Sequence, residues 1–356
     1  MLSYIEFLKY CLSESAPTAE ILRVIDWGAL LLWAKKQGIV GVVFSGIERM
    51  GARNTIPFNT KMQWIGLAQR IEQQNRTLNV RCEELVSVLE REGFECCILK
   101  GQGNATMYPN PLLRASGDID VWTRGKSIKD TITFAHTNNP HGKACYHHVD
   151  YGLFNDVELE IHYRPTFMNN LIGNRRLQRW IFKHKNEQFE HKVTLPDGCK
   201  IATPTWEFNV ILQLSHIYRH VIQGGIGLRQ IIDYYYLLIS DEREQKDGVC
   251  RTLRYLDFYE IAGAVMWVLR DILGLSEEYL IVPVNERRGK FLFDEIMQGG
   301  NFGYYDIRVK HSSSAMRMNI NRLKRDLRLV RYFPSECLWE PIFRVYHFFW
   351  RLVNQN

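Results

Sequence analysis

The sequence contains no apolar run of the roughly 20 residues that a membrane-spanning helix requires. Its most apolar stretches, residues 28–34 and 231–239, are much shorter. Residues 1–15 place Glu6 and Lys9 inside an apolar pattern, which is typical of an amphipathic helix and not of a secretory signal peptide. We therefore expect a cytoplasmic protein.

Several sequence motifs are also missing. The eight cysteines include no Cys-x-x-Cys pair, which argues against a zinc site or a disulfide framework and fits a reducing compartment. No Gly-Lys-Ser/Thr triplet follows the glycine turn at residues 101–103, so this turn is not a P-loop. We find no internal repeat and no low-complexity segment.

The spacing of apolar residues divides the chain into three regions. Residues 1–92 repeat apolar residues at steps of three and four, which predicts helices. Residues 93–201 contain short runs typical of strands, at 95–99, 118–122, 144–151, 157–163 and 192–195. The helical pattern returns over residues 202–356. This order predicts an α+β fold, with a small mixed β-sheet core between N-terminal and C-terminal helical regions.

The residues richest in chemistry lie between positions 100 and 122. Gly101 and Gly103 follow a short apolar run, so a strand would end in a glycine turn whose backbone N–H groups can bind a phosphate. Asp118 and Asp120 alternate with apolar residues, which puts both carboxylates on one face of a strand, roughly 6–7 Å apart. Such carboxylates repel each other unless a cation lies between them. Mg²⁺ prefers oxygen ligands, so it is the cation that we expect between them.

A further acidic run lies at residues 157–163. There Glu158, Glu160 and His162 alternate with apolar residues and share one face of the expected strand. The turn at 152–156 predicts a hairpin between this run and the run 144–151. The pattern leaves two interpretations open: a plain edge strand with a solvated polar face, or a strand that supplies a third carboxylate.

The histidines outside this run carry weaker signals. His216 and His220 lie four residues apart on a predicted helix, but no third zinc ligand is nearby, so we expect no metal there. His147 and His148 are adjacent, and the alternation of a strand would put them on opposite faces. This pair is therefore interpreted as part of the sheet surface.

Lys100-Gly101, Arg114 and Gly117-Asp118-Ile119-Asp120 resemble the motifs of the nucleotidyltransferase superfamily, which has the polymerase β-like fold. The layout is most similar to that of a bacterial family described as uncharacterised nucleotidyltransferases. The chain departs from the superfamily pattern in its Gly101-Gln102-Gly103 turn and in a longer gap between this turn and the first aspartate.

The resemblance implies roles for individual residues. Asp118, Asp120 and Glu160 would be catalytic and would hold two Mg²⁺ ions, with Glu160 preferred to Glu158 as the third carboxylate. Nucleotide binding would fall to Lys100, Gly101, Gly103, Arg114 and Ser116. The cleft would be lined by Glu158, His162, His216, Arg229 and Asp233. A buried Arg229–Asp233 ion pair is the structural alternative for the last two.

The reaction implied is the Mg²⁺-dependent transfer of a nucleoside monophosphate from an NTP to an acceptor hydroxyl, with release of pyrophosphate. The acceptor could be a small molecule, a sugar, a protein or a tRNA. A catalytically weak nucleotide-binding or interaction module is the alternative. An RNA-binding scaffold is a third hypothesis, because residues 317–331 carry one acidic residue and six basic ones: Arg317, Arg322, Lys324, Arg325, Arg328 and Arg331.

Overall fold

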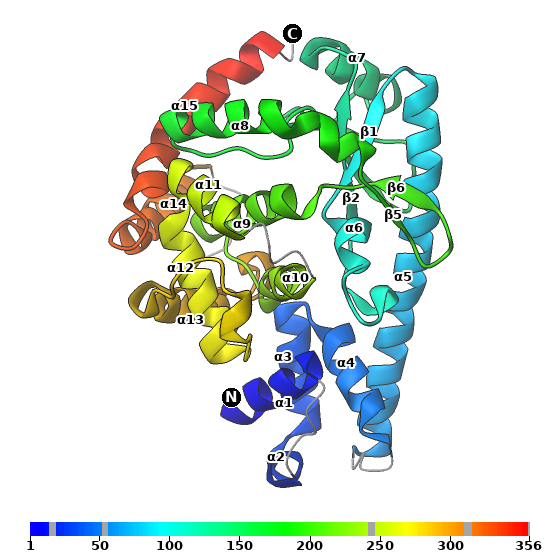
Figure 1. Cartoon of the computed structure of the whole chain (residues 1–356), viewed down its shortest axis with the longest axis vertical. Helices are drawn as coiled ribbons and strands as arrows, with labels where there is room; N and C mark the ends of the chain where they lie inside the picture. The colour runs from blue at the N-terminus through cyan, green and yellow to red at the C-terminus, as the bar shows by residue number, and fades with distance from the viewer. Residues whose placement is uncertain (14–18, 52–55, 241–245, 310–314, 355–356) are drawn as a thin grey trace.

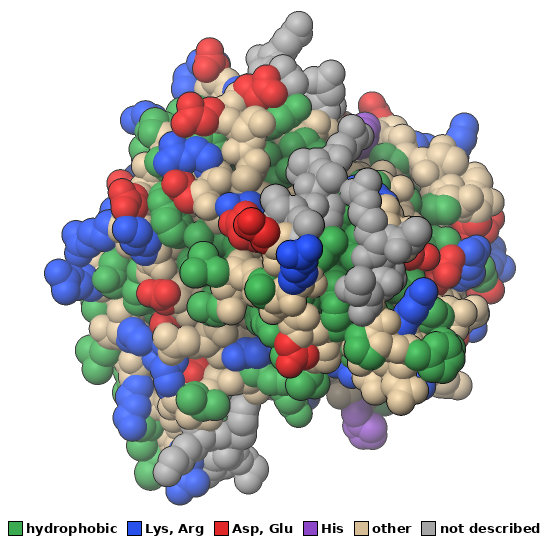
Figure 2. All heavy atoms as spheres, turned by 90° about the horizontal axis from the view of Figure 1, so that it is seen from below, with side chains coloured by type: hydrophobic (Ala, Val, Ile, Leu, Met, Phe, Trp, Pro, Cys, Tyr) green, Lys and Arg blue, Asp and Glu red, His purple; other side chains and the backbone are tan. Residues whose placement is uncertain are grey.

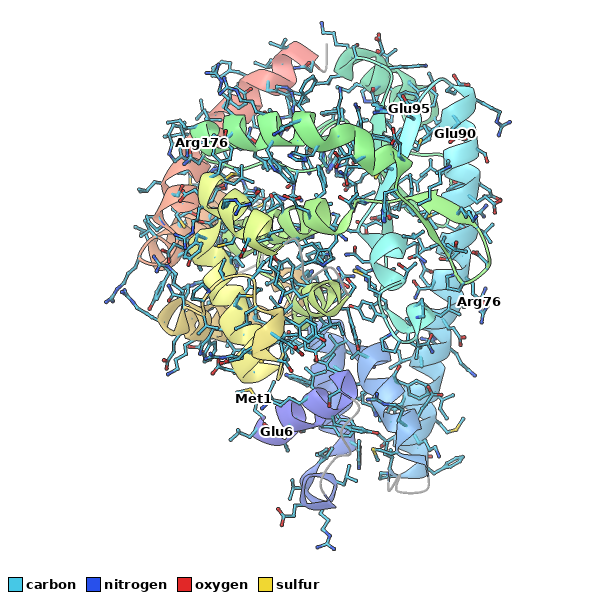
Figure 3. All side chains as sticks on the ribbon, in the orientation of Figure 1. Met1, Glu6, Arg76, Glu90, Glu95 and Arg176 are labelled. Atoms are coloured by element: carbon cyan, nitrogen blue, oxygen red, sulfur yellow. The ribbon has the colours of Figure 1, made fainter. Side chains whose placement is uncertain are left out.

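The computed structural model describes residues 1–13, 19–51, 56–240, 246–309 and 315–354. Its N-terminal region is helical and consists of α1 (Leu2–Leu12), α2 (Ala19–Val24), α3 (Trp27–Gln37), α4 (Val40–Arg49) and α5 (Phe58–Arg91) (Figure 1). Helix α5 has 34 residues and runs along one edge of the molecule. Arg76 and Glu90, labelled in Figure 3, lie on its exposed side.

The small mixed sheet that the sequence predicts is confirmed, and its strand order is β1-β2-β4-β3. Strand β1 (Glu95–Leu99) pairs antiparallel with β2 (Asp118–Arg124), and β2 pairs parallel with β4 (Glu158–His162). Strand β3 (His148–Tyr151) pairs antiparallel with β4, which confirms the predicted hairpin. Between these strands lie α6 (Gly101–Ala105), the 3₁₀ turn η2 (Pro111–Leu113) and α7 (Ile128–Asn138).

The two faces of the sheet have different neighbours. Ile119 and Val121 point to one face, where they join a core formed with buried residues of α5 such as Leu85. Trp122 points to the other face and stacks on Phe208 of the following helical region. Asp118 and Asp120 share the face of Trp122 by the period-two alternation of a strand. The helical region therefore packs beside both aspartates.

The rest of the chain is mainly helical, in agreement with the predicted α+β class. Its elements are α8 (Leu171–Glu190), the small hairpin β5 (Lys192–Thr194) and β6 (Lys200–Ala202), α9 (Trp206–Gln223), α10 (Leu228–Ile239), α11 (Lys246–Tyr255), α12 (Tyr259–Trp267), η4 (Val268–Ile272), η5 (Glu277–Tyr279), α13 (Glu286–Gly299), η6 (Asn301–Gly303), α14 (Ala315–Leu329) and α15 (Pro334–Asn354). Helix α8 lies where the sequence predicts mainly strands, and Asn170 caps its N-terminus by accepting hydrogen bonds from the backbone N–H groups of Ile172 and Gly173.

The six basic residues of the stretch 317–331, on which the RNA-binding hypothesis rests, do not all face solvent. Arg325 is buried and lies 3.6 Å from a carboxylate oxygen of Asp306. Arg328 forms an ion pair of 2.9 Å with Glu295 of α13. These two arginines hold α14 against the body of the protein. The remaining four basic side chains are exposed: Arg317, Arg322, Lys324 and Arg331.

Charged and apolar side chains are mixed over the surface of the molecule that Figure 2 shows, seen from below in the orientation of Figure 1. Within the described ranges, no helix has both the length and the apolar character that a bilayer span requires.

Candidate functional site

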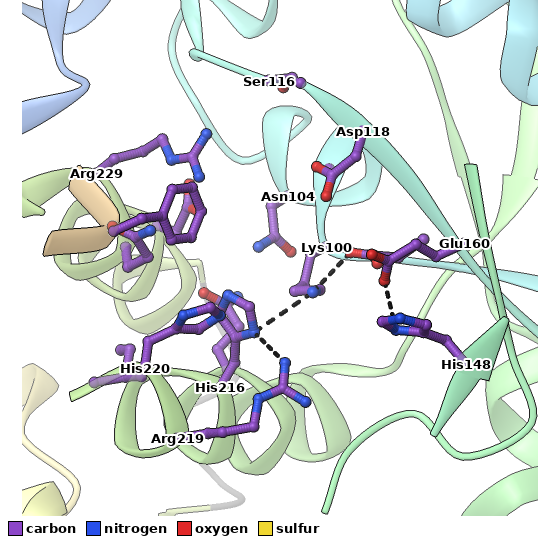
Figure 4. A pocket seen from close by; sticks show the side chains of 18 of the residues that line it. Lys100, Asn104, Ser116, Asp118, His148, Glu160, His216, Arg219, His220 and Arg229 are labelled. Atoms are coloured by element: carbon purple, nitrogen blue, oxygen red, sulfur yellow. Dashed lines mark hydrogen bonds and ion pairs between the residues drawn. The ribbon is translucent and has the colours of Figure 1, made fainter. Parts of the chain in front are cut away.

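A cavity of about 280 Å³ opens where the sheet meets the C-terminal helices (Figure 4). One wall comes from β2, β4 and the turn between β1 and α6, and the opposite wall comes from α9 and α10. Most of the predicted site residues line this cavity: Lys100, Gly101, Arg114, Ser116, Asp118, Asp120, Glu160, His216, Arg229 and Asp233. The structure thus brings together residues that are up to 133 positions apart, from Lys100 to Asp233.

The carboxylate wall follows from the parallel pairing of two strands. Asp120 of β2 and Glu160 of β4 are direct partners in the register, so their side chains project side by side. Asp118 lies two residues before Asp120 on the same face and points into the cavity. Glu158 is the register partner of Asp118 but is exposed and does not line the cavity.

Two basic side chains already contact Asp120. The Lys100 ammonium lies 2.7 Å from one carboxylate oxygen, and Nε2 of His162 lies 2.8 Å from the other. Burial alone would raise the pKa of Asp120, but these two neighbours hold it well below its usual range. The side chain is therefore an anion held by positive neighbours, in a buried position.

Glu160 is placed between two histidines. His148 Nδ1 lies 2.7 Å from its carboxylate, and His162 Nε2 lies 3.2 Å from it. Burial opposes ionisation of Glu160, yet the hydrogen bonds from both histidines lower the pKa of its carboxyl to about 2. Asp120, Glu160 and His162 together offer three potential metal-ligand atoms that lie within 4.8 Å of one another.

Asp118 is the carboxylate that no cation neutralises directly. Among the described residues it has no ion-pair partner within 4.0 Å, and its carboxylate faces the open part of the cavity (Figure 4). The charge of Asp120 is the main reason that the pKa of Asp118 is raised, with burial adding to it. A cation bound between the two aspartates would relieve this repulsion.

The turn between β1 and α6 brings Lys100 and Gly101 to the cavity. Both have positive φ, 52° for Lys100 and 37° for Gly101. A positive φ is uncommon for a residue with a long side chain and often marks a functional position.

Gly103 lies outside the cavity. A Cβ atom at this position would come within 2.8 Å of the Thr203 side chain, so this glycine permits close packing.

The predicted alternative pairing of Arg229 with Asp233 is wrong. Asp233 is instead held by Arg114, whose Nε and Nη2 donate to its two carboxylate oxygens over 2.7 and 2.8 Å. The Tyr108 hydroxyl donates to the same carboxylate, and Arg114 Nη1 donates to the Ser116 hydroxyl. Arg114 lies on the loop before β2, and its side chain extends to Asp233 on α10. Because Arg114 binds both oxygens of this carboxylate, Asp233 does not pair with Arg229.

The helical wall of the cavity is positively charged. His216, Arg219 and His220 project from α9, and Arg229 projects from α10 (Figure 4). Arg219 Nη1 donates to His147 Nε2 over 2.8 Å, and Arg229 Nη1 donates to the backbone carbonyl of Ala115 over 3.0 Å. Neither arginine has an acidic partner within 4.0 Å in the described parts of the chain.

Burial affects the protonation of this wall. It lowers the pKa of His216 and of His220 well below the usual range, and the neighbouring Lys100 and Arg219 add to the effect. Both imidazoles are therefore neutral near pH 7. The positive charge that remains on this wall belongs to Arg219 and Arg229, because a guanidinium stays protonated even where burial lowers its pKa.

Residues 23–274 match a family described as uncharacterised nucleotidyltransferases. The chain belongs to this family. No curated protein matches the chain. Among solved structures, it is similar to an antigenic nucleotidyltransferase-like protein from Paracoccidioides brasiliensis, with 14% identity and a TM-score of 0.35, over 59% of this chain and 95% of that one.

Sequence reasoning misplaced one histidine pair. His147 and His148 both line the cavity, and with His162 they form a second group of potential metal ligands within 4.8 Å. The expectation that they lie on opposite sheet faces was wrong because β3 begins only at His148. His147 belongs to the preceding loop, where strand alternation does not apply.

Arg219 is a functional candidate that the sequence analysis did not select. It occupies a polar stripe on α9, where Gln213, His216, His220 and Gln223 recur at three- and four-residue steps and all line the cavity. Such a stripe on a helix that is otherwise buried and apolar is the signal that could have identified it.

Proposed function

We propose that this protein transfers a nucleoside monophosphate from an NTP to an acceptor hydroxyl and releases pyrophosphate. The observation that carries the proposal is the division of one cavity into two charged walls. Asp118, Asp120 and Glu160 form the acidic wall, and Arg219 and Arg229 face it without acidic partners of their own. A ligand that combines a divalent cation with a polyphosphate complements both walls, and an NTP bound to Mg²⁺ is such a ligand.

The acidic wall fits a hard divalent cation. Three carboxylates from adjacent parallel strands converge, and the raised pKa of Asp118 reflects repulsion that a cation would remove. Asp118, Asp120 and Glu160 would hold Mg²⁺, as two ions in the arrangement that we expect. When bound, Mg²⁺ would neutralise phosphate charge and lower the pKa of the attacking hydroxyl.

The cationic wall supports binding of the triphosphate. Arg219 and Arg229 are half-buried, so each guanidinium has lost part of its hydration without gaining a carboxylate, and a phosphate group would offset this cost. Arg219 and Arg229 would bind phosphate oxygens directly, together with the ammonium of Lys100 and the backbone N–H of Gly101. Ser116 would donate a hydrogen bond at the same end of the cavity, and Arg114 would contribute its charge from its fixed position on Asp233.

The proposed chemistry is an in-line displacement at the α-phosphate. The acceptor oxygen forms the new P–O bond while the bond to the pyrophosphate oxygen breaks, and Arg219, Arg229 and Lys100 stabilise the charge on the leaving pyrophosphate. The hydroxyl proton leaves to water at the acidic wall, because the lowered pKa of Glu160 makes its carboxylate a weak base, and Glu160 acts here as a metal ligand. His162 would position Asp120 and Glu160, because its Nε2 contacts both carboxylates.

A label-transfer assay tests this function. The protein would be incubated with Mg²⁺, cell extract as acceptor, and an NTP labelled at either the α- or the γ-phosphate. Transfer of the α-label alone is expected for wild type and for Asp156→Asn, a change in a surface ion pair with Arg81. The Asp118→Asn/Asp120→Asn variant should lose transfer by about 1,000-fold or more. Transfer of the γ-label would instead indicate a kinase.

The same assay distinguishes the alternative, a nucleotide-binding module without catalysis. Such a module would bind Mg²⁺–NTP, and so gain thermal stability, without transferring label to any acceptor in the extract. The RNA-binding scaffold is the weaker alternative, because two of its six basic residues, Arg325 and Arg328, are engaged in ion pairs inside the protein.

A further inference from the structure

Helices α14 and α15 carry apolar stripes that face solvent. On α14, Met316, Ile320, Leu323 and Leu327 lie at positions i, i+4, i+7 and i+11, and all four are exposed. On α15, the exposed residues Leu338, Ile342, Val345, Phe349 and Leu352 continue the same spacing over i to i+14. This spacing places each set on one side of its helix. Leu327 and Leu338 are 77% and 64% exposed.

The opposite sides of these helices are anchored to the protein. Leu329 of α14 is fully buried, and Phe343 of α15 packs edge-on against Tyr146 beside the sheet. Arg344 of α15 donates to Asn319 of α14 over 2.9 Å, which links the two helices. The stripes are therefore held outward by packing on the inner faces, at the outer edge of the molecule away from α5 (Figure 1).

The exposed charges of the two helices have one sign. The acidic residues between 315 and 354 are Asp326, Glu336 and Glu340, and all three are buried. The exposed charged side chains of the same segment are basic: Arg317, Arg322, Lys324, Arg331 and Arg351. Thus the outer surface combines two apolar stripes with positive charge and with no exposed acidic residue in the segment.

We propose that the surface formed by the two stripes and these five basic residues docks on an anionic lipid bilayer. Amphipathic helices with Leu and Phe on one side and Lys or Arg beside it bind in the headgroup region, with the apolar side towards the acyl chains. Anionic headgroups would neutralise the exposed basic residues of this segment. A second copy of the chain fits less well, because it would bring the same positive charges together.

Vesicle sedimentation with the full-length protein tests this inference. The probes are vesicles of phosphatidylcholine alone and of phosphatidylcholine with about 30% phosphatidylglycerol, which supplies anionic headgroups. We expect binding to the anionic vesicles that weakens about tenfold between 0.1 and 0.5 M salt. Equal binding to neutral vesicles, or no binding to either, would overturn the proposal.

Matched variants locate the contact. Leu327→Gln/Phe349→Gln removes apolar contacts from both stripes, and Arg317→Gln/Lys324→Gln removes two flanking charges. Each should weaken vesicle binding about tenfold, whereas Phe58→Gln, a change at a 75% exposed phenylalanine on α5, should not. All of these side chains are exposed, so the fold should persist. A stable dimer of the wild type that dissociates in the apolar double variant would overturn the lipid assignment in favour of self-association.

Discussion

The Lys100 ammonium lies 2.7 Å from a carboxylate oxygen of Asp120. A metal ion bound at the acidic wall would need the same carboxylate as a ligand. Lys100 also lies 3.5 Å from His216 Nδ1 on the opposite wall, so this one side chain spans the cavity (Figure 4). A lysine that neutralises a metal-binding carboxylate competes with the metal, yet the same charge can serve the triphosphate once the nucleotide arrives.

Replacing this lysine should therefore change metal and nucleotide binding in opposite directions. In Lys100→Met, Asp120 loses a competing cation, so Mg²⁺ affinity without nucleotide should rise several-fold. NTP affinity in the presence of Mg²⁺ should fall about tenfold, because one charge-assisted contact is lost. Calorimetric titration measures both constants. Lys290→Met, which removes a surface ion pair with Glu286, is the control. Parallel changes in both affinities would contradict this role of Lys100.

Replacing Arg219 or Arg229 should weaken NTP binding without lowering the thermal stability of the free protein. Arg219→Gln and Arg229→Gln each remove a half-buried charge that has no acidic partner among the described residues, so the melting temperature without ligand should not fall. Each variant should bind Mg²⁺–NTP about 10- to 100-fold more weakly. Thermal melting with and without NTP measures both effects. A variant with unchanged NTP affinity would remove that arginine from the proposed site.

The buried ion pair between Arg114 and Asp233 links the loop before β2 to α10, and so fixes the two walls relative to each other. Arg114→Met or Asp233→Asn leaves an uncompensated buried group, and each should cost about 3–5 kcal/mol of unfolding free energy. The double variant should cost clearly less than the sum, because both charges are gone. Denaturant unfolding of the four proteins gives the coupling energy. Additive losses would mean that the two residues act independently.

A buried carboxyl pair between α14 and α15 makes stability depend on pH. Burial, with the nearby Glu340 carboxylate, raises the pKa of Asp326 to about 7. The folded state therefore binds a proton more tightly than the unfolded state, so stability falls as pH rises from about 4 to about 7. Asp326→Asn should melt at a higher temperature than wild type at pH 8 and at a similar temperature at pH 5. A constant difference at both pH values would exclude titration of Asp326 as the cause.

The sequence was sufficient to predict the local geometry of the acidic wall. The alternation in 118–121 and in 157–162 fixes which side chains share a face, and the parallel register of β2 and β4 then brings Asp120 beside Glu160. The sequence also favoured Glu160 over Glu158 through a family resemblance. The structure supplies a physical difference between them, because Glu160 lines the cavity and Glu158 is exposed.

The partners of the charged residues could not be predicted in this way. The spacing of Arg229 and Asp233 on one helix suggests an ion pair between them. Asp233 instead pairs with Arg114, which lies 119 residues earlier in the chain. Likewise, six basic residues in 317–331 suggest one basic face, yet Arg325 turns inward to Asp306. Such long-range choices depend on tertiary packing, which local periodicity does not contain.

The most direct test of the divided cavity is metal binding at the acidic wall. Mn²⁺, a paramagnetic substitute for Mg²⁺, can be titrated by electron paramagnetic resonance with a nonhydrolysable NTP analogue present. Wild type and Asp156→Asn should bind Mn²⁺ with the same affinity, and Asp118→Asn and Glu160→Gln should each bind it at least about tenfold more weakly. Equal Mn²⁺ affinity in all four proteins would contradict the assignment of these carboxylates as metal ligands.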